Sequence, residues 1–311
     1  MYELRLSHHI PPAAPPALAI QEWAERVEEA TGGRVKFTIY PSESLAKGGQ
    51  VLWATQRGIC DVAMLNLAYA GQQLSLNSVF TLGSLAVPSE SGTEIWDRLL
   101  GRFPEMEAEL SGVRVLGKSV STSTAIHVRD KELHVPDDVS DMKIAAMGDR
   151  LSAVQAAGAT PVNMSPAGWK AAARKGVIVG CMAPIYVVTD RGMEAVFDSH
   201  LDLGLGQGGE IVVMNCVVWS RLPADIRAVI DGLTPWLSEA LRTSSLRVEA
   251  EGWQKCAGQT VTRPTSEELK LWMACFEPAT QQWIRENADK GPSQEIYDYL
   301  RQLIEEYQSE S

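Results

Sequence analysis

Histidines and glycines are the residues of this sequence whose types and spacing come closest to supporting chemistry. His8 and His9 are adjacent at the end of an expected strand, so their side chains point to opposite faces and do not chelate one metal ion. His9 stands where a first parallel strand gives way to a helix, which is where ligands bind in open α/β sheets, and we expect it to contact a ligand. Residues 204–209 read G-x-G-x-x-G. Because they precede a strand instead of opening a helix, they predict a flexible connection rather than a dinucleotide site.

Signatures of catalysis and of metal binding are missing from the sequence. It contains no G-x-S-x-G, P-loop or H-E-x-x-H, and the other histidines lack metal-ligand spacing. The five cysteines include no C-x-x-C pair, so neither a zinc site nor a disulfide framework is expected. Cys60, Cys181 and Cys216 fall in apolar strand segments and are expected to be buried, whereas Cys256 and Cys275 fall in helices and could pair in an oxidising compartment. We expect no catalytic residue, no cofactor and no metal.

Length and charge exclude several classes of partner. The 311 residues suffice for two lobes, each with a core of its own. Lys and Arg number 28 against 39 Asp and Glu, and this net charge of -11 argues against nucleic acid and anionic membranes as partners. No run of 18 apolar residues is present to span a membrane. Residues 2–7 already alternate as a strand, so we expect either a cytoplasmic protein or one whose signal peptide was removed, with Met1 added.

Strands and helices alternate in the first part of the chain. Residues 2–8, 35–39 and 59–65 read as strands, with helices between them at about 16–31 and 48–57. This β-α-β-α-β order predicts the start of a doubly wound parallel sheet, with the ligand outside the carboxyl ends of its strands.

A second unit of the same order occupies residues 136–184. An aromatic-led helix, a basic residue, a Gly turn and a strand ending in Met occur both at 53–64 and at 169–182. This short repeat fits two α/β lobes of like topology facing one another across a ligand cleft. The strand ends of the second unit carry small and soft side chains that would line such a cleft, namely Ala145, Met147, Met182 and Ala183.

The segments between and after these units set further expectations. Residues 66–88 read as a long irregular connection of the functional or lid-like kind, and Ser91 with Glu94 reads as a capping box. Residues 184–197 are expected to be mostly helical, and 210–219 to form a strand buried on both faces. The remainder of the chain predicts three or four helices.

We divide the chain into two α/β lobes. Lobe I takes residues 1–121 plus 211–250, and lobe II takes residues 122–210 plus 251–311 with the C-terminal helices. The chain then crosses between the lobes near residues 121, 210 and 250, and a hinge of several strands permits closure around a ligand.

Over nearly its whole length the sequence resembles the substrate-binding proteins of tripartite ATP-independent periplasmic (TRAP) transporters, the DctP-type family. The matching segments are, in order, L-R-L-S-H-H-I-P-P, T-G-G-R-V-K-F-T-I-Y-P, R-G-I-C-D-V-A-M, V-P-D-D-V-S-D-M-K-I, G-A-T-P-V-N-M, K-G-V-I-V-G and M-N-C-V-V-W-S-R-L-P-A-D-I-R. The resemblance implies a periplasmic-binding-protein-like fold, with a ligand cleft between two lobes and a long helix that spans both. It also implies an exported, monomeric receptor that captures a small organic anion and delivers it to the small and large membrane subunits, without catalysing a reaction.

Departures from the family pattern bear on the identity of the ligand. Family members carry an arginine directly after the K-I of D-x-K-G-x-K-I-R, and its guanidinium clamps the ligand carboxylate; this position is Ala145 here. The usual acidic residue of G-V-V-D-G is Val179, whereas the usual aromatic residue of the preceding helix is kept as Trp169. Either Arg150 or Arg129 supplies the missing charge, or the ligand has an aromatic or apolar body.

The expected substrate-binding residues lie at strand ends or in the loops just after them. They are His9, Asn66, Tyr69, Ser123, Ala145, Met147, Arg150, Trp169 and Met182. Two other functions stay open: a sensory ligand-binding module of the same fold, and an enzyme with dispersed catalytic residues. The sequence contains no transmembrane or signalling segment, which favours the freely diffusing receptor.

Overall fold

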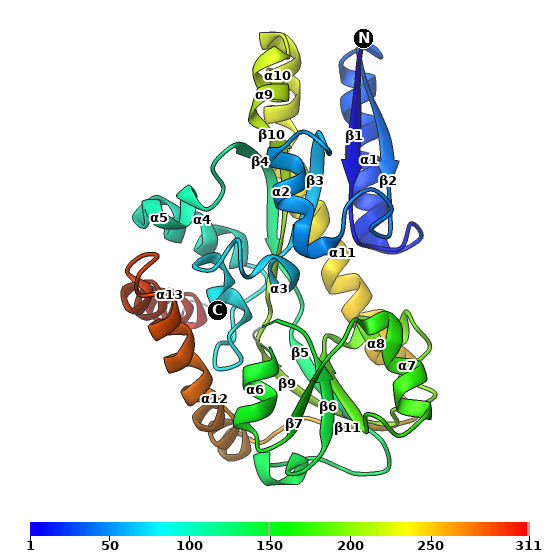
Figure 1. The fold of residues 1–311 in the computed structure, drawn as a ribbon, viewed down its shortest axis with the longest axis vertical. Coiled ribbons are helices and arrows are strands. Elements are labelled where there is room, and N and C mark those ends of the chain that lie inside the picture. The colour runs from blue at the N-terminus through cyan, green and yellow to red at the C-terminus, as the bar shows by residue number, and fades with distance from the viewer. Residues whose placement is uncertain (149, 310–311) are drawn as a thin grey trace. The chain divides into compact units, whose positions relative to one another are not determined.

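A computed structural model describes residues 1–148 and 150–309. The chain divides into two compact units, both built of strands and helices (Figure 1). Unit 1 consists of residues 1–77, 89–121 and 209–247, and unit 2 consists of residues 78–88, 122–208 and 248–311. The long helix α11 (Thr234–Lys255) has residues in both units. The fold is therefore α/β and two-lobed, as the sequence predicts.

The sheet of unit 1 has the strand order β2-β1-β3-β10-β4. β1 is parallel to β2 and β3, whereas β10 is antiparallel to both of its neighbours. The first residues of β10 therefore lie at the same edge of the sheet as the carboxyl ends of β1 and β3. The strands are β1 (Tyr2–Ser7), β2 (Val35–Tyr40), β3 (Val62–Asn66), β4 (Val113–Val120) and β10 (Gly209–Asn215).

Helix α1 (Pro15–Ala30) covers β1 and β2 in unit 1 (Figure 1). Ile20, Trp23 and Val27 recur at helical spacing, so they form one apolar stripe that packs against Leu4 and Leu6 of β1 in a buried core. The other helical segments of unit 1 are η1 (Gly48–Gln50), α2 (Val51–Gln56), α3 (Leu67–Ala70), α4 (Gly92–Arg102), α5 (Pro104–Ala108), α9 (Cys216–Arg221) and α10 (Ala224–Gly232).

The sheet of unit 2 has the strand order β11-β9-β5-β8-β6-β7. β6 is parallel to β7 and β8, whereas β5 is antiparallel to β8 and β9. The first residues of β5 therefore share one edge with the carboxyl ends of β6, β7 and β8. The strands are β5 (Thr124–Val128), β6 (Lys143–Ala146), β7 (Thr160–Asn163), β8 (Gly180–Ala183), β9 (Ser199–Leu205) and β11 (Thr260–Thr262).

Helices cover the unit 2 sheet over two separate apolar clusters. Ala146 belongs to the cluster that contains Trp272 and Phe276 of α12, whereas the preceding residue, Ala145, belongs to the cluster that contains Trp169 of α7. This alternation follows from the pleat of β6. The helical segments, of which α12 and α13 lie side by side in Figure 1, are α6 (Arg150–Ala156), α7 (Pro166–Arg174), α8 (Ile185–Thr189), α12 (Ser266–Glu286) and α13 (Ser293–Ser309), with the turns η2 (Asn77–Thr81) and η3 (Pro136–Val139).

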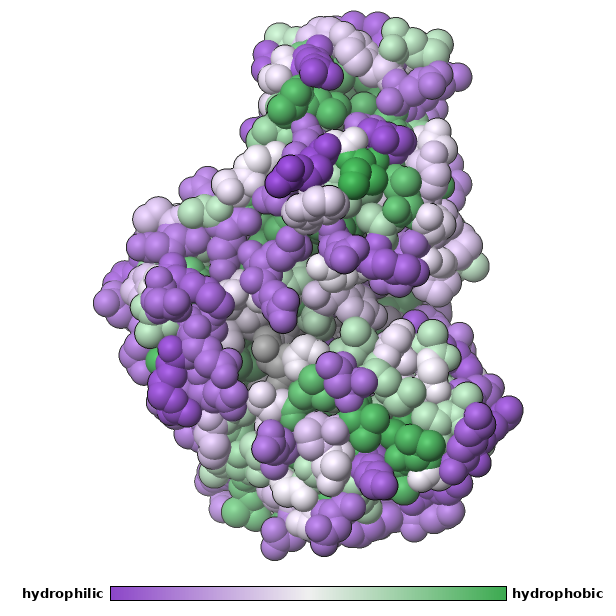
Figure 2. Space-filling model, viewed as in Figure 1, coloured by the Kyte–Doolittle hydropathy of each residue, from purple (hydrophilic) through white to green (hydrophobic). Residues whose placement is uncertain are grey.

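Hydrophilic side chains gather on the surface. Figure 2 shows hydrophilic side chains over most of the visible face, including α12 and α13, with smaller hydrophobic areas between them. None of the helices in residues 1–148 and 150–309 combines the length and the apolar character that a bilayer crossing requires.

The strand expected over 210–219 is shorter in the structure. It ends at Asn215, because the Oδ1 atom of Asn215 accepts hydrogen bonds from the backbone N–H groups of Val217 and Val218 and so caps α9. Cys216 is consequently exposed on α9, and the expectation that it is buried in a strand is wrong. The first three strands are parallel, as the sequence predicts, and the later strand β10 enters antiparallel between β3 and β4.

Three local expectations need correction. Of the flexible connection expected over 204–209, Gly204 and Leu205 belong to β9 and Gly209 begins β10, so only residues 206–208 connect the two strands. The side chain of Ser91 makes no capping hydrogen bond, so the predicted capping box is wrong, whereas Thr265 and Glu268 do form one at the start of α12. Within 184–197 the helix α8 ends at Thr189. Cys256 and Cys275 are both free thiols.

The connection expected to be irregular over 66–88 contains the helix α3 and the turn η2, and its residues 78–88 belong to unit 2, where side chains of α12 anchor them. Trp283 Nε1 donates a hydrogen bond to Ser78 Oγ over 2.9 Å, and the hydroxyls of Ser84 and Thr280 lie 2.7 Å apart. Both contacts are buried. These two contacts therefore hold the segment to α12 at Ser78 and at Ser84.

Candidate ligand-binding site

The carboxyl edge of the unit 1 sheet brings together the three residues that the sequence predicts there. Asn66 is the last residue of β3 and stands opposite Glu210 of β10 in the strand register. His9 follows β1, and its ring meets the ring of Tyr69 edge to face, with centroids 5.2 Å apart. Asn66 Oδ1 accepts a hydrogen bond from the backbone of Ala68 and so caps α3, the short helix that carries Tyr69.

Glu210 is a buried acid in this cluster that sequence reasoning missed. Asn66 Nδ2 donates a hydrogen bond to Glu210 Oε1 over 2.7 Å, and His9 Nε2 lies 3.8 Å from the same oxygen. The other oxygen, Oε2, is buried and has no hydrogen-bond partner among the described residues. Burial raises the pKa of Glu210 to about 8, although the hydrogen bond from Asn66 acts in the opposite direction. A lone acid inside the apolar run G-E-I-V-V-M was the signal that could have identified it.

Arg150 is the cation that the structure places at the carboxyl edge of the unit 2 sheet. It begins α6 and is 9% exposed. Its Nε donates to Thr124 Oγ1 over 2.8 Å and its Nη2 to the carbonyl oxygen of Gly206 over 3.4 Å. Arg129, by contrast, is exposed, follows the opposite end of β5 and donates to the carbonyl oxygen of Val196. β5 has 5 residues, so Thr124, the partner of Arg150, lies roughly 17 Å along the sheet from Arg129.

Ser123 and the two methionines also lie near this edge. Ser123 precedes β5 and donates a hydrogen bond over 3.1 Å to Glu249, a carboxyl group whose pKa is raised by burial. Met147 follows β6 and is half-buried against the cluster that contains Trp169, whereas Met182 in β8 is buried in the other cluster.

Ala145 and Trp169 lie in the core of unit 2. Ala145 is fully buried, stands between Val162 of β7 and Cys181 of β8, and packs in one cluster with Trp169. Trp169 is 1% exposed, and its Nε1 donates to the carbonyl oxygen of Met164 over 2.9 Å. Contact of these two side chains with a ligand stays a prediction.

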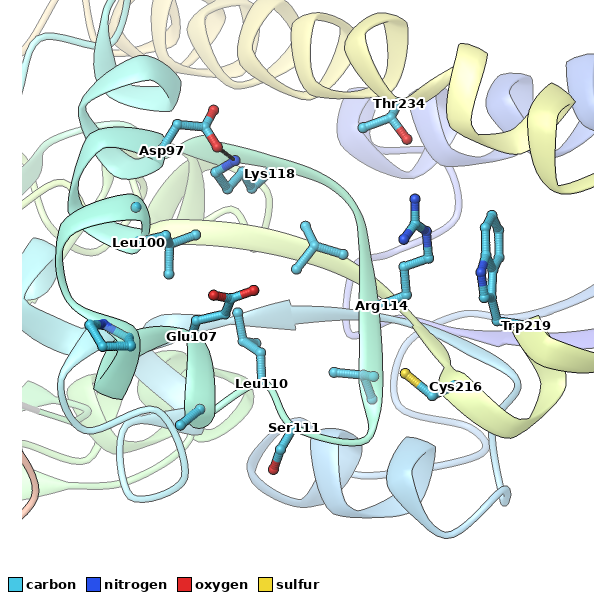
Figure 3. Close-up of a pocket in the computed structure, with 15 residues that line it drawn as sticks. Asp97, Leu100, Glu107, Leu110, Ser111, Arg114, Lys118, Cys216, Trp219 and Thr234 are labelled. Carbon is cyan, nitrogen blue, oxygen red and sulfur yellow. Dashed lines mark hydrogen bonds and ion pairs between the residues drawn. The ribbon is translucent and has the colours of Figure 1, made fainter.

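A cavity of about 890 Å³ lies elsewhere in unit 1, between α4, α5, β4 and α9 (Figure 3). Lys118 is paired with Asp97 at 2.6 Å. Arg114 lies over the ring of Trp219 at 4.4 Å and is paired with Asp231. None of the residues predicted from the sequence to bind substrate lines this cavity. Because carboxylates neutralise both cations, the cavity is poorly suited to an organic anion.

Metal ligation finds no support in the described part of the chain. No group of three or more His, Cys, Asp or Glu side chains is arranged there to hold an ion. The chemistry available at the two carboxyl edges is therefore hydrogen bonding, charge and apolar contact.

Comparisons with known proteins identify a family for this chain. The sequence profile of bacterial extracellular solute-binding protein family 7, DctP, matches residues 6–287. The C4-dicarboxylate-binding periplasmic protein DctP of Rhodobacter capsulatus is 25% identical over 291 residues, which cover 88% of this chain and 84% of that protein.

Solved structures share the fold. A marine metagenome TRAP solute-binding protein specific for aromatic acid ligands, in complex with metahydroxyphenylacetate, has a TM-score of 0.89 and 21% identity, with 99% of each chain covered. A TRAP solute-binding protein from Rhodoferax ferrireducens T118, in complex with copurified benzoate, has a TM-score of 0.88 and 19% identity, again with 99% of each chain covered.

Family and fold are those of periplasmic substrate-binding proteins rather than enzymes, and the resemblance seen in the sequence is confirmed. Because the family profile spans most of the sequence, the chain belongs to bacterial extracellular solute-binding protein family 7, the DctP family of TRAP-type solute-binding proteins.

Proposed function

We propose that this protein is the periplasmic receptor of a TRAP-type secondary transporter, and that it delivers a small organic acid to the small and large membrane subunits. The ligand is bound through residues at the carboxyl edges of the two sheets. Family membership supports the role of receptor. The organic acid is supported by one observation above all, the buried guanidinium of Arg150.

Arg150 is suited to bind a carboxylate. Its hydrogen bonds to Thr124 and Gly206 go to oxygens without formal charge, and these bonds orient the guanidinium. A guanidinium offers five N–H donors in a planar fork that matches a carboxylate, and in a buried setting the attraction is screened little. Arg150 therefore replaces the family arginine that is absent at Ala145, and Arg129 does not.

An aromatic or apolar body is favoured for the ligand. Tyr69 in unit 1 and Met147 in unit 2 offer apolar surface near the two edges. Two solved structures of the same fold are complexes with aromatic acids, one with metahydroxyphenylacetate and one with copurified benzoate. We therefore place aromatic monoacids ahead of dicarboxylates as candidate ligands, and Ser123 and Asn66 as polar groups beside them.

A thermal-shift panel of benzoate, metahydroxyphenylacetate, succinate and D-glucuronate tests the function. A ligand present at 100 times its Kd stabilises the protein by about 2.7 kcal/mol, which is a readily measured shift. We expect at least one aromatic acid to bind. If none of the four acids shifts a folded sample, the proposed ligand class is wrong.

Arg150→Met and the matched variant Arg129→Met test whether Arg150 is the cation that binds the ligand carboxylate. A charge-assisted hydrogen bond contributes about 1.5–3 kcal/mol, so Arg150→Met should weaken binding of the best acid by roughly 10-fold to 150-fold. Arg129→Met should leave the affinity unchanged. Arg150→Lys, which keeps the charge, controls for loss of folding. Equal affinities in the Arg150→Met and wild-type proteins would exclude Arg150 as the clamp.

A further inference from the structure

The G-x-G-x-x-G run at residues 204–209 makes contacts in unit 2 that the proposed function has not yet used. Residues 206–208 form the turn after β9, and Gly206 and Gly208 have φ values of +64° and +78°. These angles lie in the left-handed region, which glycine adopts without strain. Glycine at these two positions therefore permits the tight turn on which the following contacts depend.

Segment 78–88 holds the turn 206–208 in place. The backbone N–H of Gly206 donates a hydrogen bond to the carbonyl oxygen of Leu85 over 2.8 Å. The side chain of Gln207 is buried, and its Oε1 atom accepts a hydrogen bond from the backbone N–H of Val87 over 2.9 Å. Side chains of α12 anchor the segment in its turn, so residues 206–208 have fixed neighbours in unit 2.

The carbonyl oxygen of Gly206 is the point at which Thr124 and Arg150 meet. Thr124 Oγ1 donates a hydrogen bond to this oxygen over 2.7 Å and accepts one from Arg150 Nε over 2.8 Å. A guanidinium has no acceptor and a hydroxyl has one proton, so the direction of both bonds is fixed. Arg150 Nη2 lies 3.4 Å from the same carbonyl oxygen. The three groups therefore close a ring of hydrogen bonds along one edge of the guanidinium.

This ring is buried, and its hydroxyl comes from a stiff side chain. Thr124 is 1% exposed and Arg150 is 9% exposed. A β-branched residue such as Thr has few χ1 rotamers. The register between β5 and β9 also shifts between Thr124 and Ala125, and irregularities of this kind re-aim a side chain at the end of a strand. An arginine has many rotamers, so holding one of them before the ligand arrives lowers the entropic cost of binding.

We propose that Thr124 and the turn 206–208 form a bracket that sets the orientation of the Arg150 guanidinium for the ligand carboxylate. Thr124 is a positioning residue, because it acts on the ligand through Arg150. A bidentate contact needs the guanidinium and the carboxylate to lie in one plane, so a tilted guanidinium binds the carboxylate less tightly. This inference rests on the proposed function, in which Arg150 binds the ligand carboxylate.

A double-mutant cycle on Thr124 and Arg150 tests the bracket. Titration calorimetry gives the affinities of the wild-type protein, Thr124→Val, Arg150→Met and the double variant for one probe. The probe is the acid among benzoate, metahydroxyphenylacetate, succinate and D-glucuronate that gives the largest thermal shift. Affinities too weak for calorimetry are read from the thermal shift at increasing probe concentration.

Thr124→Val keeps the shape of the side chain and removes the hydroxyl. In the wild-type background it should weaken binding of the probe by roughly 5-fold to 30-fold, because the guanidinium loses the group that orients it. In the Arg150→Met background the same change should have no further effect on affinity, because the group through which Thr124 acts is gone. A purely structural role for Thr124 would give the same loss in both backgrounds.

Further variants separate positioning from folding. Thr124→Ser keeps the hydroxyl and should recover most of the affinity lost in Thr124→Val. Thr189→Val removes another buried hydroxyl of unit 2, which donates to the carbonyl oxygen of Ile185 in its own helix, and should bind the probe as the wild-type protein does. If Thr124→Val does not fold, Gly206→Ala takes its place in the cycle. Alanine is strained at the φ of +64°, so this variant displaces the carbonyl oxygen, and the same pattern of affinities is expected.

The outcomes separate the bracket from the proposed function. An equal loss of affinity from Thr124→Val in the wild-type and Arg150→Met backgrounds, or no loss in the wild-type background, overturns the bracket and leaves the receptor function intact. A loss in Thr124→Ser as large as that in Thr124→Val overturns it too. Wild-type affinity in Arg150→Met overturns both the clamp and the bracket. Failure of the folded wild-type protein to bind any of the four acids overturns the organic-acid ligand and this inference together.

Discussion

The Nδ1 atoms of His127 and His200 lie 2.8 Å apart in the core of unit 2. Both outer nitrogens face oxygens: His127 Nε2 lies 3.0 Å from the carbonyl of Ala183, and His200 Nε2 lies 2.8 Å from Gln259 Oε1. The amide of Gln259 is oriented by its donation to the carbonyl of Glu194. Completing this chain requires three protons, one more than two neutral imidazoles carry. Burial and the neighbouring ring oppose that third proton.

This histidine pair predicts a loss of stability in acid. Burial lowers the pKa of both rings, that of His127 to about 3, while in the unfolded chain both titrate near 6.5. As pH falls below 6.5, the two imidazoles become protonated in the unfolded state but stay neutral in the folded state. Stability is therefore lost from about pH 6.5 downward, by up to about 1.4 kcal/mol per pH unit for each ring. Urea unfolding at pH 7.5 and pH 5 should show a smaller difference in His127→Gln than in the wild-type protein. The exposed His134→Gln is the control, and equal differences in all three proteins would contradict the prediction.

Glu210 should act on stability in the opposite pH direction. Its folded pKa, raised to about 8, exceeds the ordinary value, so its contribution is fully present in acid and is lost as pH rises from about 4.5 to about 8. Ligand-free Glu210→Gln should match the wild-type protein at pH 5 and melt at a higher temperature at pH 8.5. A melting-temperature difference that is the same at both pH values would show that Glu210 is ionised in the folded protein throughout.

Trp169→Ala should destabilise the protein strongly, because its ring is buried in the core of unit 2. Truncation of a buried Trp to Ala costs about 3–5 kcal/mol, measured as the free energy of unfolding in urea. Trp53→Ala, which removes a ring that is 46% exposed, should cost less than about 1 kcal/mol. The predicted ligand contact is read separately from Trp169→Phe. Unchanged affinity together with an unchanged ligand-induced fluorescence signal would contradict that contact.

Gly209 and Gly101 should respond to alanine with opposite signs. A Cβ at Gly209 would lie 2.5 Å from the ring of Trp96, so Gly209→Ala forces a shift in a packed region and should cost about 1–3 kcal/mol. At Gly101, inside α4, a Cβ meets nothing within 4 Å. Gly101→Ala should therefore stabilise the protein by about 0.5–1 kcal/mol. Thermal unfolding of the two variants measures both changes in stability. Destabilisation by Gly101→Ala would contradict the prediction.

Local sequence patterns predicted much of the fold and part of the candidate site. Alternating strands and intervening helices placed His9, Asn66 and Tyr69 at the ends of neighbouring parallel strands, and the structure brings them together. Glu210 could not be predicted as part of the site from local patterns, because its strand pairs with segments far away in the sequence. Only that pairing sets it opposite Asn66. Long-range register of this kind is not encoded in any short window.

The second unit shows a different limit. Ala145 and Ala146 are neighbours at one strand end, yet they face different clusters, so their position in the sequence does not say which side chain meets the core. Asn215 ended a strand that apolar composition alone would have continued, because its side chain satisfies two backbone N–H groups of the next helix. At this boundary, the need of the backbone N–H groups for hydrogen-bond acceptors decided where the strand ends, and the apolar composition of the segment did not.

The place of β10 in the unit 1 sheet has a consequence for biosynthesis. It lies between β3 and β4, although all of residues 122–208 are translated after β4 and before it. A nascent chain that stops short of residue 209 therefore carries two strands with unpaired backbone edges, which are sites for association with other chains. Productive folding of the N-terminal strands must wait for a segment made late, so chains interrupted before β10 are the ones that a chaperone has to protect.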